Sequence, residues 1–338
     1  MNTTPQRPIG SGFGAASTAA EVIAGHDLSG RTAIVTGGYA GIGLETVRVL
    51  RAAGARVVVP ARDLAKARQA LNDMPDVEIA RLDLMTPESI DAFAEGFLRS
   101  GLPLHLLINN AGIMANPLTR DSRGFESQFS TNHLGHFQLT TRLWPALVQG
   151  KGARIVNVSS QGHFLSPVVS DDINFERRAY DPWAAYGQSK TANALFAVEA
   201  DARGAAQGIR AFAVHPGSIV DSDLKRFLSK DDLKATGTLD EDGKAIIDPS
   251  RNRKTIAQGA ATTVWCATSL QLNGMGGVYC ENCDIAEQVP AELIAGAADG
   301  SALNFPTGVM PYALDPNAAR RLWQMSELML RSRVESFA

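Results

Sequence analysis

The chain has 338 residues, of which 35 are acidic and 32 are basic. A net charge of -3 gives no reason to expect nucleic acid or an anionic membrane surface as a partner. Its apolar runs are shorter than the roughly 20 residues that cross a bilayer, and Met1 to Ala20 lacks the basic flank and apolar core of a signal peptide. We therefore expect a cytoplasmic protein without a membrane span.

Three cysteines are too few for a disulfide framework. Cys280 and Cys283 have the spacing of a redox or zinc pair, but the sequence offers no second pair and no nearby histidine to complete a metal site. Two buried or reduced thiols near a strand end are the favoured interpretation. His133, His136 and His163 lack a carboxylate at ligand spacing, which favours histidines of a helix face or a loop, so we predict no metal.

In chain order, residues 1–28 are rich in Gly, Ser, Thr and Ala, which predicts a loosely ordered lead-in with one short helical turn at 18–24. From residue 29 onward, short β-branched runs alternate with longer amphipathic stretches. Near-continuous apolar strands separated by helices are typical of a parallel sheet covered on both faces. We predict one doubly wound, Rossmann-type α/β domain over 29–338, with strands at 32–36, 56–59, 77–80, 104–108, 154–158 and 210–214.

The first predicted strand runs into a glycine-rich turn, Thr36-Gly37-Gly38-Tyr39-Ala40-Gly41-Ile42-Gly43, and an amphipathic helix follows through Leu50. Such a turn at a helix N-terminus is an anion site, because backbone N–H groups and the helix dipole point at a phosphate. The spacing is Gly-x-x-x-Gly-x-Gly and differs from the standard dinucleotide fingerprint. A turn without a nucleotide is the alternative, but the surrounding strand and helix favour a bound nucleotide.

A second motif, Tyr186-Gly187-Gln188-Ser189-Lys190, lies in an Ala-rich run with helical periodicity from 183 to 200. Positions i and i+4 share a helix face, so the tyrosine hydroxyl and the lysine ammonium can point into the same space. Bringing the pKa of a tyrosine from about 10 to neutrality takes about 4 kcal/mol. One ammonium about 4 Å away supplies roughly that much at an effective dielectric of about 20, so Lys190 is predicted to lower the pKa of Tyr186.

Four motifs occur in the order found in the short-chain dehydrogenase/reductase family, which the chain resembles over roughly residues 28–225. They are the glycine-rich turn, Asn109-Asn110-Ala111-Gly112, a serine after the fifth strand, and Tyr186-x-x-x-Lys190. Asp-Leu-Ser-Gly-Arg before the first strand, Thr-Asn-His-Leu-Gly-His-Phe at 131–137, and His215-Pro216-Gly217-Ser218 look like the branch of retinol dehydrogenases and WW-domain oxidoreductases. Light-dependent protochlorophyllide reductases are similar as well.

The resemblance implies a catalytic set of Asn132, Ser160, Tyr186 and Lys190. Ser160 would bond the substrate oxygen as charge develops on it, and Asn132 would position a water that links Lys190 to solvent. The glycine-rich turn and the resemblance together predict that a dinucleotide contacts Gly37, Tyr39, Ala40, Gly41, Ile42, Gly43, Arg62, Asp83, Leu84, Asn110, Ala111, Gly112, Tyr186, Lys190, Pro216, Gly217 and Ser218.

Arg62 favours NADP(H) over NAD(H). NAD-preferring relatives carry an acidic residue at the position of Ala61, whereas that position is neutral here and Arg62 follows it. A guanidinium suits a dianionic 2′-phosphate by charge and by geometry. The alternative is a solvated loop arginine that pairs with Asp63.

Three further segments are expected to shape the substrate site or to pack on it. Twenty-six positions separate Ser160 from Tyr186, more than in compact relatives, and 168–181 is predicted to fold beside the substrate mouth with solvated or salt-bridged charges. Residues 222–254 are polar around a few apolar anchors, which is typical of a substrate lid. Residues 290–338 form a C-terminal extension, whose helix begins at Asp315-Pro316 and packs its apolar stripe on the body.

These observations predict an NADP(H)-dependent oxidoreductase that transfers a hydride between the nicotinamide and a small hydrophobic alcohol or ketone, with Tyr186 as the acid or base. The branch implies a steroid-, retinoid- or aromatic-ketone-like substrate. Two alternatives stay open: an NADP(H)-binding regulatory protein without turnover, and a light-dependent protochlorophyllide-type reductase. The resemblance also implies a homo-oligomer, a dimer or tetramer, formed through the helices that carry Asn132 and Tyr186.

Overall fold

The computed structural model describes residues 4–219, 224, 234, 238–290 and 307–331. Its central sheet has eight strands in the order β10-β9-β6-β5-β4-β1-β2-β3. Neighbouring strands pair in parallel, apart from the antiparallel pair β9 and β10. This order confirms the doubly wound Rossmann-type sheet. The strands are β1 (Thr32–Val35), β2 (Arg56–Ala61), β3 (Glu78–Arg81), β4 (Leu106–Asn109), β5 (Arg154–Val158), β6 (Arg210–His215), β9 (Val278–Glu281) and β10 (Asp284–Ile285).

All six strands predicted from the sequence are present, with ends within two residues of those expected. Strand β9 was not predicted, because its four residues follow a glycine-rich stretch and carry no alternating pattern. It reaches β10 through a two-residue turn in which Asn282 and Cys283 have φ of 52° and 60°. A separate pair of short strands, β7 (Ser218–Ile219) and β8 (Arg253–Lys254), follows the end of β6.

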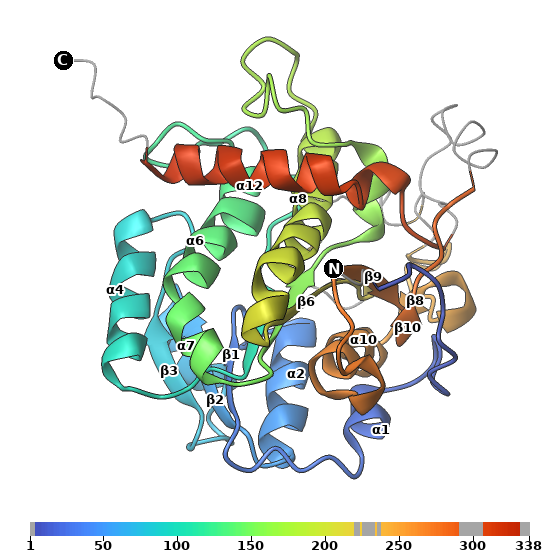
Figure 1. The fold of residues 1–338 in the computed structure, drawn as a ribbon. Coiled ribbons are helices and arrows are strands. Elements are labelled where there is room, and N and C mark those ends of the chain that lie inside the picture. The colour runs from blue at the N-terminus through green and yellow to red at the C-terminus, as the bar shows by residue number, and fades with distance from the viewer. Residues whose placement is uncertain (1–3, 220–223, 225–233, 235–237, 291–306, 332–338) are drawn as a thin grey trace.

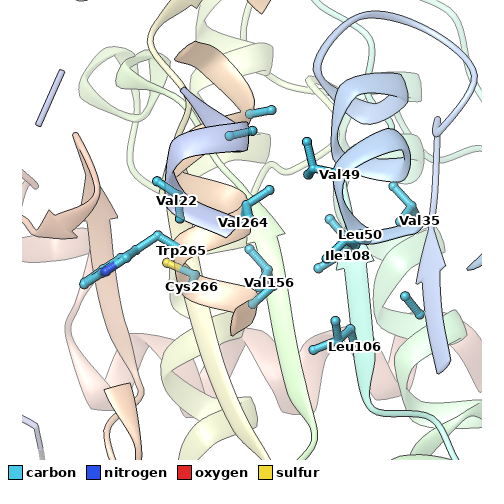
Figure 2. Close-up of a cluster of buried hydrophobic side chains, with 14 of the residues drawn as sticks. Val22, Val35, Val49, Leu50, Leu106, Ile108, Val156, Val264, Trp265 and Cys266 are labelled. Atoms are coloured by element: carbon cyan, nitrogen blue, oxygen red, sulfur yellow. The ribbon is translucent and has the colours of Figure 1, made fainter. Parts of the chain in front are cut away.

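Helices cover both faces of the sheet, and the alternation of side chains along the strands divides the core in two (Figure 1). Ala33 and Val35 of β1 face one layer, whereas Ile34 faces the other. In the first layer, Val264 and Cys266 lie beside Val156 of β5 (Figure 2). Helices α1 (Ala19–Ile23), α2 (Gly41–Ala52) and α10 (Ile256–Thr268) build this layer, and α4 (Pro87–Arg99), α6 (Gly135–Arg142), α7 (Trp144–Gln149) and α8 (Pro182–Gly204) build the opposite one.

Helix α8 is buried on nearly all sides, which fits its Ala-rich sequence. It begins where predicted, because Asp181 accepts the backbone N–H groups of Trp183 and Ala184 and proline occupies the first turn. Helix α12 (Pro316–Arg331) crosses over α6 and α8 (Figure 1). Its Trp323 ring packs 4.8 Å from the ring of Phe137, so the predicted packing of this helix on the body is confirmed.

Residues 4–28 run against the edge of the sheet. The side-chain amide of Gln6 donates to the carbonyl of Tyr279 at 2.7 Å and accepts its backbone N–H at 3.0 Å. The carboxylate of Asp284 accepts three consecutive N–H groups, those of Ile9, Gly10 and Ser11. These bonds differ from the loose order expected from composition, because they reach strands more than 270 positions away. The short helical turn expected at 18–24 is present as α1.

Helix α3 (Leu64–Ala70) completes the crossover between β2 and β3. No helix in the described ranges is both long and apolar enough to cross a membrane.

Candidate active site

A cavity of about 750 Å³ lies at the carboxyl ends of β1, β4, β5 and β6. The strand order reverses between β1 and β4, and ligands of doubly wound sheets bind at such a point. The glycine-rich turn, the turn after β4 and the N-terminal half of α8 all contribute to its lining.

The glycine-rich turn is closed by hydrogen bonds from the turn after β4. The hydroxyl oxygen of Thr36 accepts the backbone N–H groups of Asn110 and Ala111 at 2.9 and 3.0 Å. The side-chain amide of Asn110 donates to the carbonyl of Thr36 at 2.9 Å. The two turns therefore form one rigid floor for the cavity.

Two glycines allow this floor to form. Gly37 has φ of 66°, in the left-handed region that favours glycine. A Cβ on Gly43 would overlap the carbonyl oxygen of Gly37 and lie 2.5 Å from the side-chain nitrogen of Asn110. Helix α2 begins at Gly41 after Ala40, which has no polar side chain to cap it, so the first N–H groups of the helix face the turn. This arrangement fits the pyrophosphate of a dinucleotide.

Tyr186 and Ser160 meet at the inner end of the cavity. Ser160 follows β5 and its hydroxyl accepts the N–H of Gly162 at 3.0 Å. Tyr186 is 4% exposed and lines the cavity together with Ser160. A Cβ on Gly162 would lie 2.6 Å from the Tyr186 ring, so the serine turn packs directly on the tyrosine. A carbonyl oxygen entering here would find two hydroxyl groups together.

Lys190 lies one helical turn after Tyr186, with its ammonium 5.6 Å from the centre of the tyrosine ring. The ammonium donates to the carbonyl of Val158 at 2.9 Å and is 3% exposed as a residue. Burial lowers the pKa of Lys190 to about 7. Burial also raises the pKa of Tyr186 to about 12, against a smaller opposing effect of the neighbouring Ser160 hydroxyl.

The expectation that Lys190 lowers the pKa of Tyr186 is therefore wrong for this structure. The expectation counted the attraction of one charge at about 4 Å and left out desolvation. Both groups lose water in the cavity, which disfavours the phenolate and the ammonium alike. Tyr186 is consequently a protonated phenol at neutral pH.

Asn132 lies in a short π-helix, η1 (Ser130–Leu134), and is completely buried. Its amide oxygen accepts the N–H of Ile113 at 2.9 Å, and its amide nitrogen donates to Ile113 O at 3.0 Å and to Ser189 Oγ at 2.9 Å. Asn132 thus ties the turn after β4 to α8 between Tyr186 and Lys190. π-helical turns of this kind often occur at functional sites.

Comparison with known proteins agrees with this geometry. The family model for short chain dehydrogenases matches residues 31–233. The chain belongs to the short-chain dehydrogenase family. A protein of Streptomyces lividans named "Probable oxidoreductase" is 44% identical over 304 residues, which are 88% of this chain and 97% of that protein.

Two further comparisons cover nearly the whole dehydrogenase. The WW domain-containing oxidoreductase of Homo sapiens is 33% identical over 347 residues, which are 99% of this chain and 75% of that protein. This relative confirms the branch that the sequence motifs indicate. The crystal structure of an uncharacterized protein from Mycobacterium paratuberculosis has a TM-score of 0.69 and 32% identity, covering 94% of this chain and 98% of that one. The protein is thus an NAD(P)-dependent dehydrogenase or reductase.

Most residues predicted for the dehydrogenase site come together around the cavity. Gly43, Arg62, Asp83, Leu84 and Asn132 are not among its lining residues. Those that line it are Gly37, Tyr39, Ala40, Gly41, Ile42, Asn110, Ala111, Gly112, Ser160, Tyr186, Lys190, Pro216, Gly217 and Ser218.

The residues outside the lining have local roles. Asp83 accepts the backbone N–H of Met85, and the carbonyl of Leu84 packs against Gly135 of α6. Arg62 is exposed directly after β2 and has no hydrogen bond or ion pair with the described residues. Asp63, the alternative partner of Arg62, instead accepts the N–H of Lys66 and caps α3.

Sequence reasoning missed several lining residues of the dehydrogenase. Lys66 lies on α3, in a helix that no motif marked. Met114, Leu165 and Trp183 form an apolar part of the lining, and their proximity to the known motifs was the available signal. From the predicted lid, the described residues that line the cavity are Leu224, Thr238, Ser250, Arg251, Asn252 and Arg253; positions 222–223, 225–233 and 235–237 lie outside the described residues.

The insertion at 168–181 packs on α8 and contributes nothing to the cavity lining within the described chain. The amide of Gln188 donates to the carbonyl of Ile173 at 2.9 Å. The carboxylate of Asp172 accepts three consecutive N–H groups and lies 3.4 Å from the guanidinium of Arg178. Asp172–Arg178 and Asp171–Arg177 form ion pairs within the segment, in agreement with the expected solvated or salt-bridged loop.

Cys266, Cys280 and Cys283 are free and buried. Across the ranges that can be described, no group of three His, Cys, Asp or Glu side chains could hold a metal ion.

Proposed function

We propose that this chain is an NADP(H)-dependent reductase or dehydrogenase of hydrophobic ketones and alcohols, in which Tyr186 transfers the proton. The observation that carries the proposal is that Ser160, Tyr186 and Lys190 line the same cavity as the glycine-rich turn, with the serine turn packed against the tyrosine ring. A bound nicotinamide supplies or accepts the hydride.

The side chains of the chain handle the oxygen and the proton. In the reductive direction, Ser160 donates a hydrogen bond to the carbonyl oxygen and Tyr186 gives it a proton. The pKa of Tyr186, raised to about 12 by burial, keeps this proton on the phenol until charge develops on the substrate. Lys190 borders the same cavity and is proposed to hold the ribose beside Tyr186, with Asn132 supporting the helix from behind.

The preference for NADP(H) rests on the charges at the end of β2. Arg62 is exposed there, Ala61 offers no acidic group to a ribose, and Asp63 is engaged as the cap of α3. Lys66 lines the cavity one turn into α3. The guanidinium of Arg62 beside the neutral Ala61 supports a preference for a 2′-phosphate over a 2′-hydroxyl.

The hydrophobic substrate rests on the apolar side chains around Tyr186. Trp183 lines the cavity with its ring 6.4 Å from that of Tyr186 and nearly perpendicular to it. Met114 and Leu165 line the same cavity. An aromatic or alicyclic ring beside the reacting carbon would gain about 25 cal/mol per Å² of apolar surface removed from water.

The test is a panel of aromatic and alicyclic ketones and alcohols, assayed in darkness with NADPH, NADH and their oxidised forms. Activity in darkness separates the proposal from light-driven reduction. Replacing Tyr186 by Phe is expected to abolish turnover while NADPH binding, measured by fluorescence titration, is retained. Tyr180→Phe is the matched control, because Tyr180 carries a half-buried, hydrogen-bonded hydroxyl outside the lining. Cofactor binding without turnover on any substrate would instead favour a regulatory protein.

A further inference from the structure

His163 lies in the turn after Ser160, in the 3-10 helix η2 (Gln161–Leu165), and is completely buried. Its backbone N–H and its ring nitrogen Nδ1 contact the carbonyl oxygen of Ser160 at 3.1 and 2.7 Å. Its other ring nitrogen, Nε2, accepts the backbone N–H of Met310 at 3.1 Å. One imidazole therefore joins the serine turn to a segment 147 positions further along the chain.

The bond from Met310 determines the tautomer of the ring. A backbone N–H can only donate, so Nε2 must carry the lone pair. The proton of the neutral ring is then on Nδ1 and points at the carbonyl of Ser160. Burial lowers the pKa of His163 to about 4, which keeps the ring neutral near pH 7. Each ring nitrogen thus has the partner that its protonation requires.

Further contacts hold His163 from three sides. The hydroxyl of Tyr312 donates to the carbonyl of His163 at 2.6 Å. The hydroxyl of Thr191 on α8 lies 3.2 Å from the same oxygen and 2.7 Å from the carbonyl oxygen of Ser166. The hydroxyl of Tyr279 on β9 lies 3.3 Å from Nδ1. The turn that carries Ser160 is therefore connected to α8, to β9 and to the segment before α12.

We propose that His163 is a positioning residue that fastens the Ser160 turn to the C-terminal segment at 310–312, so that this segment completes the active site. The proposal rests on the proposed function, since the position of Ser160 matters for turnover only if its hydroxyl contacts the substrate.

The close packing of the turn explains why a small shift would matter. Gly162 lies against the ring of Tyr186, so the turn cannot move without changing the position of Ser160 Oγ relative to the phenol. Misplacement of a reacting group by about 1 Å costs on the order of a hundredfold in rate. His163→Phe keeps the ring and removes both polar contacts, and we expect it to lower kcat by roughly tenfold to a hundredfold with NADPH affinity unchanged.

The decisive experiment is a double-mutant cycle in the full-length protein with His163→Phe and Ser160→Ala, measuring kcat and KM for the best ketone and the Kd of NADPH. If His163 acts through Ser160, the histidine change should cost less than threefold in kcat once the hydroxyl of Ser160 is gone. Losses that multiply in the double variant would overturn the proposal. An unchanged kcat in Ser160→Ala would overturn the proposed role of Ser160 itself, and the role of His163 with it.

His163→Asn is the conservative variant, because its amide nitrogen can still donate to the Ser160 carbonyl while the bond to Met310 is lost. Because the proposal requires the link to the 310–312 segment, kcat of His163→Asn should fall about as far as that of His163→Phe. Recovery of kcat without the Met310 bond would overturn the proposed role of that segment. His105→Phe is the matched control: His105 is half-buried, accepts the N–H of Thr32 at 3.0 Å, and lies at the opposite end of the sheet, so kcat should be unchanged. If His163→Phe does not fold, Tyr312→Phe replaces it in the same double-mutant cycle with Ser160→Ala. Tyr312→Phe removes only the hydrogen bond to the His163 carbonyl.

Discussion

Tyr186 and Lys190 lie one helical turn apart on α8, and both are almost fully buried. Sequence spacing alone suggests that the ammonium stabilises a phenolate. In the folded chain the loss of solvent outweighs that attraction and moves the pKa of each group toward its neutral form. Tyr186 therefore holds its proton at neutral pH in the structure without a bound substrate.

The side chain of Arg62 is predicted to set the preference between the two cofactors. Arg62→Ala should raise the Kd of NADPH by roughly tenfold to a hundredfold, because a charge-assisted hydrogen bond contributes about 1.5–3 kcal/mol. The Kd of NADH should change by less than threefold, since no 2′-phosphate is present. Fluorescence titration of both cofactors measures the effect. Arg68→Ala is the control, as it removes an equal charge from an exposed position of α3 outside the cavity lining. Unchanged discrimination in Arg62→Ala would contradict the assignment.

At the scale of elements, the turn from β1 into α2 and the turn after β4 depend on each other. Thr36 and Asn110 exchange three hydrogen bonds with their neighbours across the gap. Gly43, in the first turn of α2, lies so close to the Gly37 carbonyl and the Asn110 side chain that no side chain fits at position 43. The glycine pattern is therefore a requirement of packing as well as of phosphate binding.

Gly43→Ala tests this packing. The added methyl would overlap the Gly37 carbonyl, and overpacking of this kind costs about 1–3 kcal/mol. We expect a lower unfolding temperature and at least roughly tenfold weaker NADPH binding, measured by thermal denaturation and titration. Gly96→Ala in α4 is the matched control: its nearest neighbour would be the Arg99 side chain at 3.8 Å, so it should stabilise the chain by up to about 1 kcal/mol. Equal stability of the two variants would refute the close contact.

At the scale of the whole molecule, α12 closes the helical layer. It crosses α6 and α8, the helices through which the family resemblance implies a dimer (Figure 1). Trp323 packs against both Phe137 and Phe196, and Ser326 Oγ lies 2.8 Å from His133 Nε2. A dimer through these helices would require α12 to leave its place and expose this aromatic cluster.

We therefore expect the full-length chain to have the mass of one copy in solution, or to assemble through another surface. Light scattering coupled to size-exclusion chromatography measures the mass. Cross-linking of surface lysines and arginines maps any contact. A dimer whose cross-links join α6 and α8 of the two copies would contradict the expectation.

The buried histidines predict how stability depends on pH. Burial lowers the pKa of His133 and His215 to about 3 and that of His136 and His163 to about 4. In the unfolded chain these pKa values return to about 6.5. Below pH 6.5 the unfolded state binds protons that the folded state does not, so stability is lost as the pH falls from about 6.5 to about 4. Glu281 and Glu126 act oppositely, since burial raises the pKa of Glu281 to about 7 and also raises that of Glu126. These two carboxyl groups are outnumbered by the four histidines.

Each pKa unit corresponds to about 1.4 kcal/mol, so the free energy of unfolding should fall by several kcal/mol between pH 7 and pH 4.5. Urea unfolding followed by tryptophan fluorescence at each pH measures this slope. His133→Phe should make the slope shallower, because its ring lies among those of Phe129, Phe137 and Phe196 and the substitution removes one titrating group. A free energy of unfolding that stays level over this range would show that the histidines are not buried as described.

Several features were predictable from the sequence because they depend on nearby residues. The starts of α8 and α12 follow from Asp-Pro pairs, and six strands follow from short β-branched runs. The glycine-rich turn and the Tyr186–Lys190 motif come from spacing along one element, and both line the same cavity in the folded chain.

Tertiary structure alone decided the features that depend on residues far apart in the chain. The sequence does not show that Gln6 binds Tyr279, that α12 covers α8, or that Met310 reaches His163, since each contact joins segments more than 100 positions apart. The direction of the pKa shift of Tyr186 was mispredicted for the same reason: spacing reveals the neighbouring charge, but the burial that dominates the pKa is produced by the whole fold.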